Sequence, residues 1–390
     1  MRALILILLF FLMFSSNAFA DNGASTVSSA DKGSETSLKK ALSINPEDPQ
    51  TNLELGILYY NRGIYDEARD FFETVKTIAP GTKLSEQAEE YIREIEKKEK
   101  AGIKGKRWGL NLTGGFQYDS NVVLEPSDGT LPEGISRKSD WRGIIYFEGK
   151  YTPILTEKLT LGPTYSFYQS LHTKLHDFNV QQHQPGLSLN YIINKDFSLR
   201  ANYAYEYTTV GGEGYLSSHT LSPIITIAEG KGFFVSVRYR YQRKDFRDSD
   251  LFMSNSERNG SNNLIGITQY IPLGSVASLK LGYAHDVDSA DRKYWSYRGD
   301  EADIDLNFDL GKKWALDLSG QYYRKDYRED YPGTTTRRDD KTTTYSINLT
   351  KTFDSKYDIT AGWLHIRNES NINVFEYKRD ILTFIMRVGL

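Results

Sequence analysis

Polar and apolar residues alternate along the second part of the chain, and the pattern begins at residue 108. One face of the extended chain carries Trp108, Leu110, Leu112, Gly114, Phe116 and Tyr118. The opposite face carries Asn111, Thr113, Gly115, Gln117 and Asp119. A period of two is typical of a β-strand with one apolar and one polar face. The sequence therefore predicts a strand here, after which residues 119–122 leave the sheet for the outside.

The same alternation recurs down to Leu390, interrupted by two kinds of connection. Long polar loops are predicted at residues 120–139, 171–178, 210–217, 247–259, 288–297, 328–340 and 368–376. Short turns are predicted at residues 152–158, 194–196, 229–232, 272–275, 311–313 and 354–356. These connections join about 14 strands, and an even number brings both ends of the sheet to the same side. That side carries the short turns.

Aromatic residues indicate what the apolar face contacts. The chain contains 27 Tyr and 19 Phe, most of them at alternating positions near the predicted strand ends. Such rings suit a membrane interface, because one end of the ring is apolar and the other polar. The mean hydropathy of -0.52 does not oppose this reading, since barrel strands hide apolar residues in alternation. Residues 106–390 therefore predict an antiparallel transmembrane β-barrel. The strands of a soluble β-sandwich or propeller also alternate between polar and apolar residues. The regular succession of long loops and short turns favours the barrel.

Residues 1–20 have the layout of a secretory signal peptide. Arg2 supplies the positive start, an apolar run follows, and Ala18, Phe19 and Ala20 match a cleavage site. The run is shorter than the ~20 residues of a spanning helix, so an uncleaved anchor is the weaker alternative. Residues 21–29 are small and polar and predict a flexible linker. The sequence has no cysteine, which excludes disulfides, thiolate metal sites and lipid attachment to cysteine.

Residues 30–105 have helical periodicity. Their small and large residues match the spacing of a tetratricopeptide repeat over about 34 residues. The matching residues are Leu55, Gly56, Tyr59, Gly63, Tyr65, Ala68, Phe72 and Pro80. Gly56 and Ala68 would let two helices approach closely, and Pro80 would end the second helix. We expect a small all-α domain of about one and a half repeats, capped by an amphipathic helix at residues 85–100. It would be either a peptide-docking surface or a rigid spacer.

Charged residues are frequent on the predicted inward faces of the barrel. They include Arg142, Glu148, Lys150, Arg200, Glu206, Arg238, Arg240, Asp303, Asp305, Asp309, Asp317 and Lys325. Unpaired charge at this density cannot lie in a dry core. The sequence therefore predicts either a water-filled lumen or a polar network across it. The arginines at 238 and 240 lie three predicted strands away from the acidic residues 303–309.

No enzymatic chemistry is predicted. The sequence has six histidines, and none of them has a nucleophile and an acid in the arrangement of a catalytic triad. His285 precedes Asp286, but adjacent strand residues point to opposite faces. No calcium-loop or zinc spacing occurs, so we expect no metal and no cofactor. The net charge of -3 excludes a nucleic-acid partner on electrostatic grounds.

The segment Tyr118 to Val122, together with the layout of signal peptide, helices and barrel, resembles the surface lipoprotein assembly modifiers of Gram-negative bacteria. The resemblance implies a barrel in the outer membrane, helices in the periplasm and a client lipoprotein that the protein helps to deliver. The helical domain is small for that family. Two other functions stay open: export of an exopolysaccharide, and a general solute porin. An inward-folded loop at residues 120–139 would favour the porin. We expect a monomeric barrel surrounded by outer-membrane lipid.

Overall fold

The computed structural model describes Leu38, Leu42, and residues 45–61, 64–102, 107–126, 129, 137–156, 158–230, 232–274, 276–353 and 357–389. The described residues fall into two compact units, a helical unit that ends before Arg107 and a barrel unit that begins there. The predicted signal peptide and linker, residues 1–29, lie outside the described residues.

The barrel unit consists of antiparallel strands with short helical turns in some connections. The strands are β1 (Trp108–Asp119), β2 (Asp140–Tyr151), β3 (Ile154–Leu155), β4 (Leu159–His172), β5 (Val180–Ile192), β6 (Phe197–Val210), β7 (Glu213–Gly230), β8 (Phe233–Phe246), β9 (Gly260–Leu273), β10 (Ala277–Ala290), β11 (Tyr297–Gly311), β12 (Trp314–Asp330), β13 (Arg337–Phe353), β14 (Tyr357–Ser370) and β15 (Tyr377–Gly389). The helical turns are η2 (His176–Phe178), η3 (Asn255–Arg258), η4 (Lys293–Trp295) and η5 (Asn373–Phe375).

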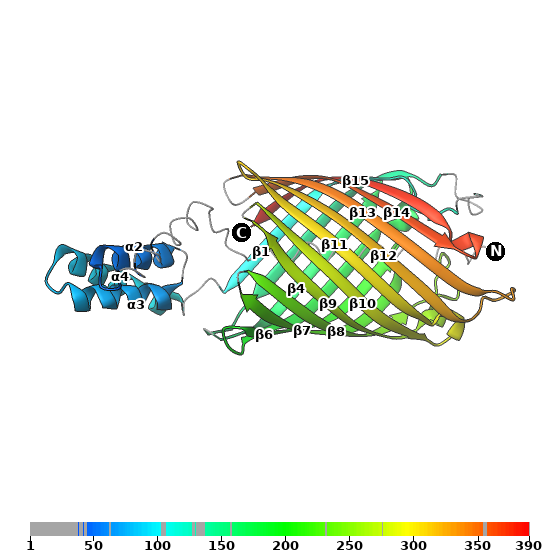
Figure 1. Cartoon of the computed structure of the whole chain (residues 1–390). Coiled ribbons are helices and arrows are strands. Elements are labelled where there is room, and N and C mark those ends of the chain that lie inside the picture. Colours follow the sequence, from blue (N-terminus) through cyan, green and yellow to red (C-terminus); the bar gives the residue numbers. More distant parts are fainter. Residues whose placement is uncertain are drawn as a thin grey trace. The chain divides into compact units, whose positions relative to one another are not determined.

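The sheet closes on itself. β1 pairs with β2 on one side and with β15 on the other, from Asn111 opposite Gly389 to Asp119 opposite Ile381. The sheet has 15 strands, but β3 has only two residues and β2 pairs directly with β4. Without β3 the closed barrel has 14 strands, which confirms the predicted number. Figure 1 shows the tilted strands around the barrel. Within the described residues, closure gives each of these 14 strands a paired neighbour on both sides, as a barrel in a membrane requires.

The outward face of the barrel is an apolar belt. Residues predicted to face lipid are strongly exposed, for example Trp108 at 60%, Phe116 at 63% and Phe384 at 56%. A belt of this size would be unstable in water, and it fits the hydrocarbon region of a membrane. β9 alternates poorly in sequence because polar Asn263 and Gln269 share its outward face with isoleucines. Its register with β8 and β10 is nevertheless continuous.

One of the predicted long loops is wrong, and another is shorter than predicted. Residues 210–217 contain only a tight turn, because β6 ends at Val210 and β7 begins at Glu213. Gly211 and Gly212 have φ angles of 62° and 89°, and paired glycines allow a two-residue hairpin turn. The loop predicted at residues 328–340 is confirmed but shorter, because β12 runs to Asp330 and β13 starts at Arg337. The residues at these strand ends are polar, as loop residues commonly are, and this led to the longer loop predictions.

The helical unit contains α2 (Pro49–Asn61), α3 (Tyr65–Ile78) and α4 (Lys83–Gly102). Its core consists of Leu53, Tyr60, Ala68, Phe72, Val75, Ala88, Ile92 and Ile95. Asp48 caps α2 by accepting hydrogen bonds from the backbone and side chain of Thr51, and these bonds hold the pKa of Asp48 below its usual range. Among the described residues, no helix has the length and apolar character needed to cross a membrane.

The residues that match the repeat spacing differ in how deeply they are buried in this unit. Leu55, Ala68 and Phe72 are completely buried, and Tyr59 and Tyr65 pack against the core. Pro80 is exposed after the end of α3, and Gly63 lies outside the described residues. Gly56 lies against the Phe72 ring: a Cβ atom at residue 56 would be 2.5 Å from Phe72 Cε1.

Gly56→Ala should therefore loosen the helical unit. The added methyl group forces α2 away from Phe72, and overpacking of this kind costs about 1–3 kcal/mol. In limited proteolysis of the full-length protein, the helices of the variant should be cleaved faster than those of the wild type. Glu89→Ala, at an exposed position of α4, is the control and should leave the cleavage rate unchanged. Equal rates for all three proteins would show that the close approach at Gly56 is unimportant.

Candidate functional site

The interior of the barrel is accessible at one end and packed at the other. On β11, inward-facing Tyr297 and Gly299 are buried, Asp303 is half-buried, and Asp309 at the short-turn end is exposed. The same gradient runs along β13 from buried Arg338 to half-buried Thr350. Solvent therefore reaches the interior from the short-turn end, whereas the long-loop end is closed.

A segment of the first long loop closes this end. Residues 120–126, here called the inturned segment, follow β1 and turn into the barrel. Val122, Val123 and Leu124 are 0%, 0% and 2% exposed. They share a hydrophobic cluster with Phe178, Val180, Val210, Tyr215, Leu216, Phe246, Phe252, Ile366 and Tyr377. Phe178 lies in η2 and Phe252 in the loop after β8. The other partners come from β5–β8 and from β14 and β15, which lie on opposite sides of the closed sheet. The prediction that the chain leaves for the outside at residue 122 is therefore wrong.

Hydrogen bonds fix the inturned segment to the wall. The Asn121 side chain donates to the carbonyl oxygens of Glu125 at 3.0 Å and Lys378 at 2.9 Å. Its own oxygen accepts from the backbone N–H of Glu125 at 2.8 Å. Glu125 also forms a salt bridge with Lys138 at 2.7 Å. Because Asn121 is 3% exposed, it satisfies backbone groups that would otherwise be buried without partners.

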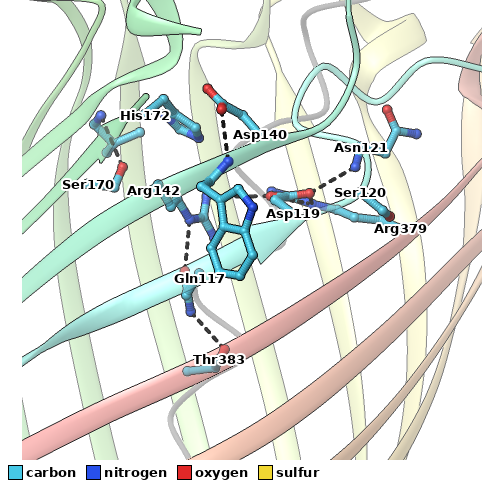
Figure 2. A network of polar contacts seen from close by, with 12 residues as sticks. Gln117, Asp119, Ser120, Asn121, Asp140, Arg142, Ser170, His172, Arg379 and Thr383 are labelled. Atoms are coloured by element: carbon cyan, nitrogen blue, oxygen red, sulfur yellow. Dashed lines mark hydrogen bonds and ion pairs between the residues drawn. The ribbon is translucent and has the colours of Figure 1, made fainter. Parts of the chain in front are cut away.

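A buried ion pair lies directly below the inturned segment (Figure 2). Arg379 of β15 donates through Nε to both carboxylate oxygens of Asp119, at 3.0 and 3.1 Å, and also through Nη2. Arg142 Nη1 lies 3.6 Å from Asp119 Oδ2. The Arg142 Nε donates to Gln117 Oε1 at 2.8 Å, and Gln117 Nε2 donates to Thr383 Oγ1 at 3.1 Å. These contacts join β15, β1 and β2 at the closure of the sheet.

Arginines and aromatic rings fill the remainder of the closed end. Trp295, Tyr297, Tyr327, Tyr331 and Phe375 form a second cluster. The Arg338 guanidinium lies 3.3 Å from the centroid of the Phe375 ring and is paired with Asp340. The Arg258 guanidinium carbon lies 4.2 Å from the centroid of the Phe246 ring and 5.9 Å from that of the Trp295 ring. Arg258 therefore contacts both clusters. Burial raises the pKa of Tyr331, in the loop after β12, to about 12, which keeps its hydroxyl neutral.

The predicted inward-facing charges divide between the two regions. Arg142 and Glu206 are buried in the closed end, at 4% and 7% exposure. The charged residues that line the accessible region at half-buried positions are Glu148, Arg238, Arg240, Asp303 and Asp305. Arg200 and Asp309 are exposed near the short turns. Sequence reasoning missed Asp119 and Arg379 as partners; Asp119 was recognisable as inward-facing, but its partner comes from the other end of the sheet.

Glu206 is buried without a cationic partner among the described residues. It accepts hydrogen bonds from Thr208 at 2.9 Å and Ser218 at 3.3 Å. Glu206→Gln keeps an acceptor and removes the cost of burying an unpaired charge. The variant should therefore melt at the same temperature as the wild type or higher, as measured by heat-dependent gel mobility of the barrel. Glu206→Leu, which leaves both hydroxyls without their acceptor, should melt lower; the opposite order would contradict this reading.

Comparisons with known proteins give low similarities. No protein-family model and no curated protein matches the chain. The crystal structures of Acinetobacter baumannii OccAB3 and of a Pseudomonas aeruginosa FadL homologue share 7% and 9% sequence identity with it, with TM-scores of 0.41 and 0.42. Both matches cover 73% of this chain, and they cover 99% and 90% of those chains. A bacterial polysaccharide outer membrane secretin has 7% identity and a TM-score of 0.41, over 73% of this chain and 98% of that chain. Similarities this low assign neither a family nor a function.

Proposed function

We propose that the protein is an outer-membrane channel for small polar solutes, held closed at its long-loop end. One observation carries the proposal: the interior is polar and accessible from the short-turn end, yet the inturned segment and two clusters of buried side chains close the other end. A purely structural barrel has no need for charged residues along its accessible walls, because buried or half-buried charges cost solvation energy. In barrels of this class the short turns lie on the periplasmic side, so the closed end faces outward.

The closed end has the features of a gate. The inturned segment is anchored by apolar side chains, by the Asn121 amide and by the salt bridge between Glu125 and Lys138. It lies between β1 and β2 and belongs to neither strand, and segments outside a paired sheet open more readily than the strands do. The buried ion pair between Asp119 and Arg379 keeps the wall intact beneath it.

The helical unit is proposed to be a periplasmic adaptor with tetratricopeptide-like packing. The close contact between Gly56 and Phe72 supports that packing. Delivery of a client lipoprotein is the weaker hypothesis, because the residues of the 118–122 segment that suggested it have structural roles within the barrel. Asp119 pairs with Arg379, Asn121 anchors the inturned segment, and Val122 lies in the cluster that closes the barrel. Export of a polysaccharide would also require the gate to open.

Permeability of proteoliposomes tests the channel function. Replacing residues 121–137 by a short glycine-serine linker removes the inturned segment and retains every strand. Liposomes with this variant should swell in isotonic glucose or glycine, whereas those with the wild type should swell slowly. Empty liposomes and liposomes with a Met253→Ser variant are the controls. If the shortened variant is folded and swells no faster than empty liposomes, the protein is not a channel.

A further inference from the structure

Two rows of opposite charge lie on one wall of the accessible interior. Arg238 and Arg240 face inward from β8, and Glu301, Asp303 and Asp305 face inward from β11. The two rows are linked by strand register across β9 and β10. Strand register places Arg238 opposite Gly266 of β9, Gly266 opposite Ala284 of β10, and Ala284 opposite Glu301.

The centre of the strip between the rows, between Arg238 and the pair Glu301 and Asp303, consists of very small residues. Gly266, Gly282 and Ala284 occupy successive inward positions on β9 and β10. A Cβ atom on Gly282 would lie 2.3 Å from Asp303 Oδ1, and one on Gly266 would lie 3.1 Å from the Ala284 Cβ. Larger residues would fill the space between the charged side chains. The small residues at these positions therefore leave room for the two rows to face each other.

The rows are close enough to interact but do not form ion pairs. Arg238 interacts electrostatically with Glu301 and Asp303. Within the described part of the chain, no hydrogen bond or salt bridge joins Arg238 to a carboxylate. The Arg240 Nη2 donates to Asn262 Oδ1 at 3.0 Å, but its Nε is buried and has no acceptor. Three strand spacings correspond to roughly 14 Å between the backbones of β8 and β11, and the long side chains narrow that distance.

The charges on this wall nearly balance. Lys280, on β10 opposite Asp305, adds a cation to the two arginines, and Asp286 of β10 adds a fourth carboxylate near Glu301. A ligand that carries a single charge would satisfy one row and leave the other unsatisfied. A ligand with one charge of each sign satisfies both rows and leaves the net charge of the wall unchanged.

We propose that this wall is a binding site for a small zwitterion with one carboxylate and one ammonium group, the size of an amino acid or a dipeptide. The ligand carboxylate accepts hydrogen bonds from Arg238 and Arg240, and the ammonium group lies against Glu301, Asp303 and Asp305. The inference deepens the proposed function, because it names the class of solute that the channel would select.

Calorimetric titration of the full-length protein in detergent micelles tests the site. The probe is L-alanyl-L-alanine, compared with N-acetyl-L-alanine, which lacks the ammonium group, and L-alaninamide, which lacks the carboxylate. The dipeptide should bind, and each analogue should bind at least about 10-fold more weakly, because it forfeits its charge-assisted hydrogen bonds. Equal binding of the dipeptide and either analogue would overturn the proposal, as would no binding of the dipeptide.

Variants locate the site on this wall. The double variant Arg238→Gln and Arg240→Gln, and separately Asp303→Asn with Asp305→Asn, should each weaken dipeptide binding at least about 10-fold. Ala284→Leu should do the same by filling the strip while every charge is kept. Lys150→Gln and Glu148→Gln, on the inward face of β2, are matched controls and should bind as the wild type does. Heat-dependent gel mobility verifies that each variant is folded.

The outcomes separate the site from the channel function. Dipeptide binding in micelles does not require transport through the barrel. Suppose that the arginine and aspartate variants lose dipeptide binding while the shortened-loop variant is impermeable. The binding site would then be confirmed and the channel function rejected. Unchanged binding in those variants would reject the site, whatever the permeability of the shortened-loop variant.

Discussion

Replacing Val122, Val123 and Leu124 together by serine should convert the closed barrel into a steadily conducting pore. All three side chains are almost completely buried against both walls. Burial of each contributes about 1.5–3 kcal/mol, so the replacement removes several kcal/mol from the closed state. Because ~1.4 kcal/mol is a tenfold change, the ratio of closed to open molecules should fall more than about 100-fold.

Conductance across planar lipid bilayers measures this change. The triple variant should give long openings at a steady level, whereas the wild type should be closed for most of the recording. Met253→Ser is the matched control, because Met253 lies in another loop at the same end and is 45% exposed. A triple variant with the same closed fraction as the wild type would show that the inturned segment does not block conduction.

Arg379→Leu should be the most destabilising single substitution in the barrel. Arg379 is 1% exposed and Asp119 is 0% exposed, so the variant leaves a buried carboxylate whose one remaining cationic neighbour among the described residues is Arg142, at 3.6 Å. Loss of one partner from a buried pair costs about 3–5 kcal/mol. The temperature at which the barrel loses its compact form on a gel should fall clearly below that of the wild type.

Two further variants decide whether the cause is the unpaired charge. Asp119→Asn combined with Arg379→Gln removes both charges, keeps hydrogen-bonding groups and should recover much of the lost stability. Arg324→Leu breaks a half-exposed pair with Asp339 at 2.9 Å, and exposed pairs contribute only about 0–1 kcal/mol. If Arg324→Leu were as damaging as Arg379→Leu, burial of the pair at the closed end would not be the reason.

Alternation predicted the barrel well because each strand obeys a local rule. Trp108, Leu112 and Phe116 share a face in any extended chain, so the period of two fixed the strand and its lipid-facing side before any partner was known. The even number of strands followed from the connections. The wrong loop at residues 210–217 and the overestimated loop at residues 328–340 arose because the strand ends there are polar.

The packing at the closed end could not be predicted from the sequence. Val122, Val123 and Leu124 are three apolar residues in a polar loop, and nothing local states whether they meet lipid, solvent or the opposite wall. Their partners Ile366 and Tyr377 lie more than half the chain away. The rows of charge on β8 and β11 were recognisable on their own strands. Their alignment depends on the register through β9 and β10, which only the paired sheet defines.

The exposure of a thiol at residue 123 tests the closure of the barrel most directly. The chain has no cysteine, so Val123→Cys and Met253→Cys each introduce a single reactive group at the long-loop end. A membrane-impermeant maleimide should label folded Met253→Cys promptly, because Met253 is 45% exposed, and should leave Val123→Cys unlabelled, because Val123 is 0% exposed. Denaturation should make both thiols equally reactive. Labelling of folded Val123→Cys as fast as Met253→Cys would contradict an inturned segment that closes the barrel.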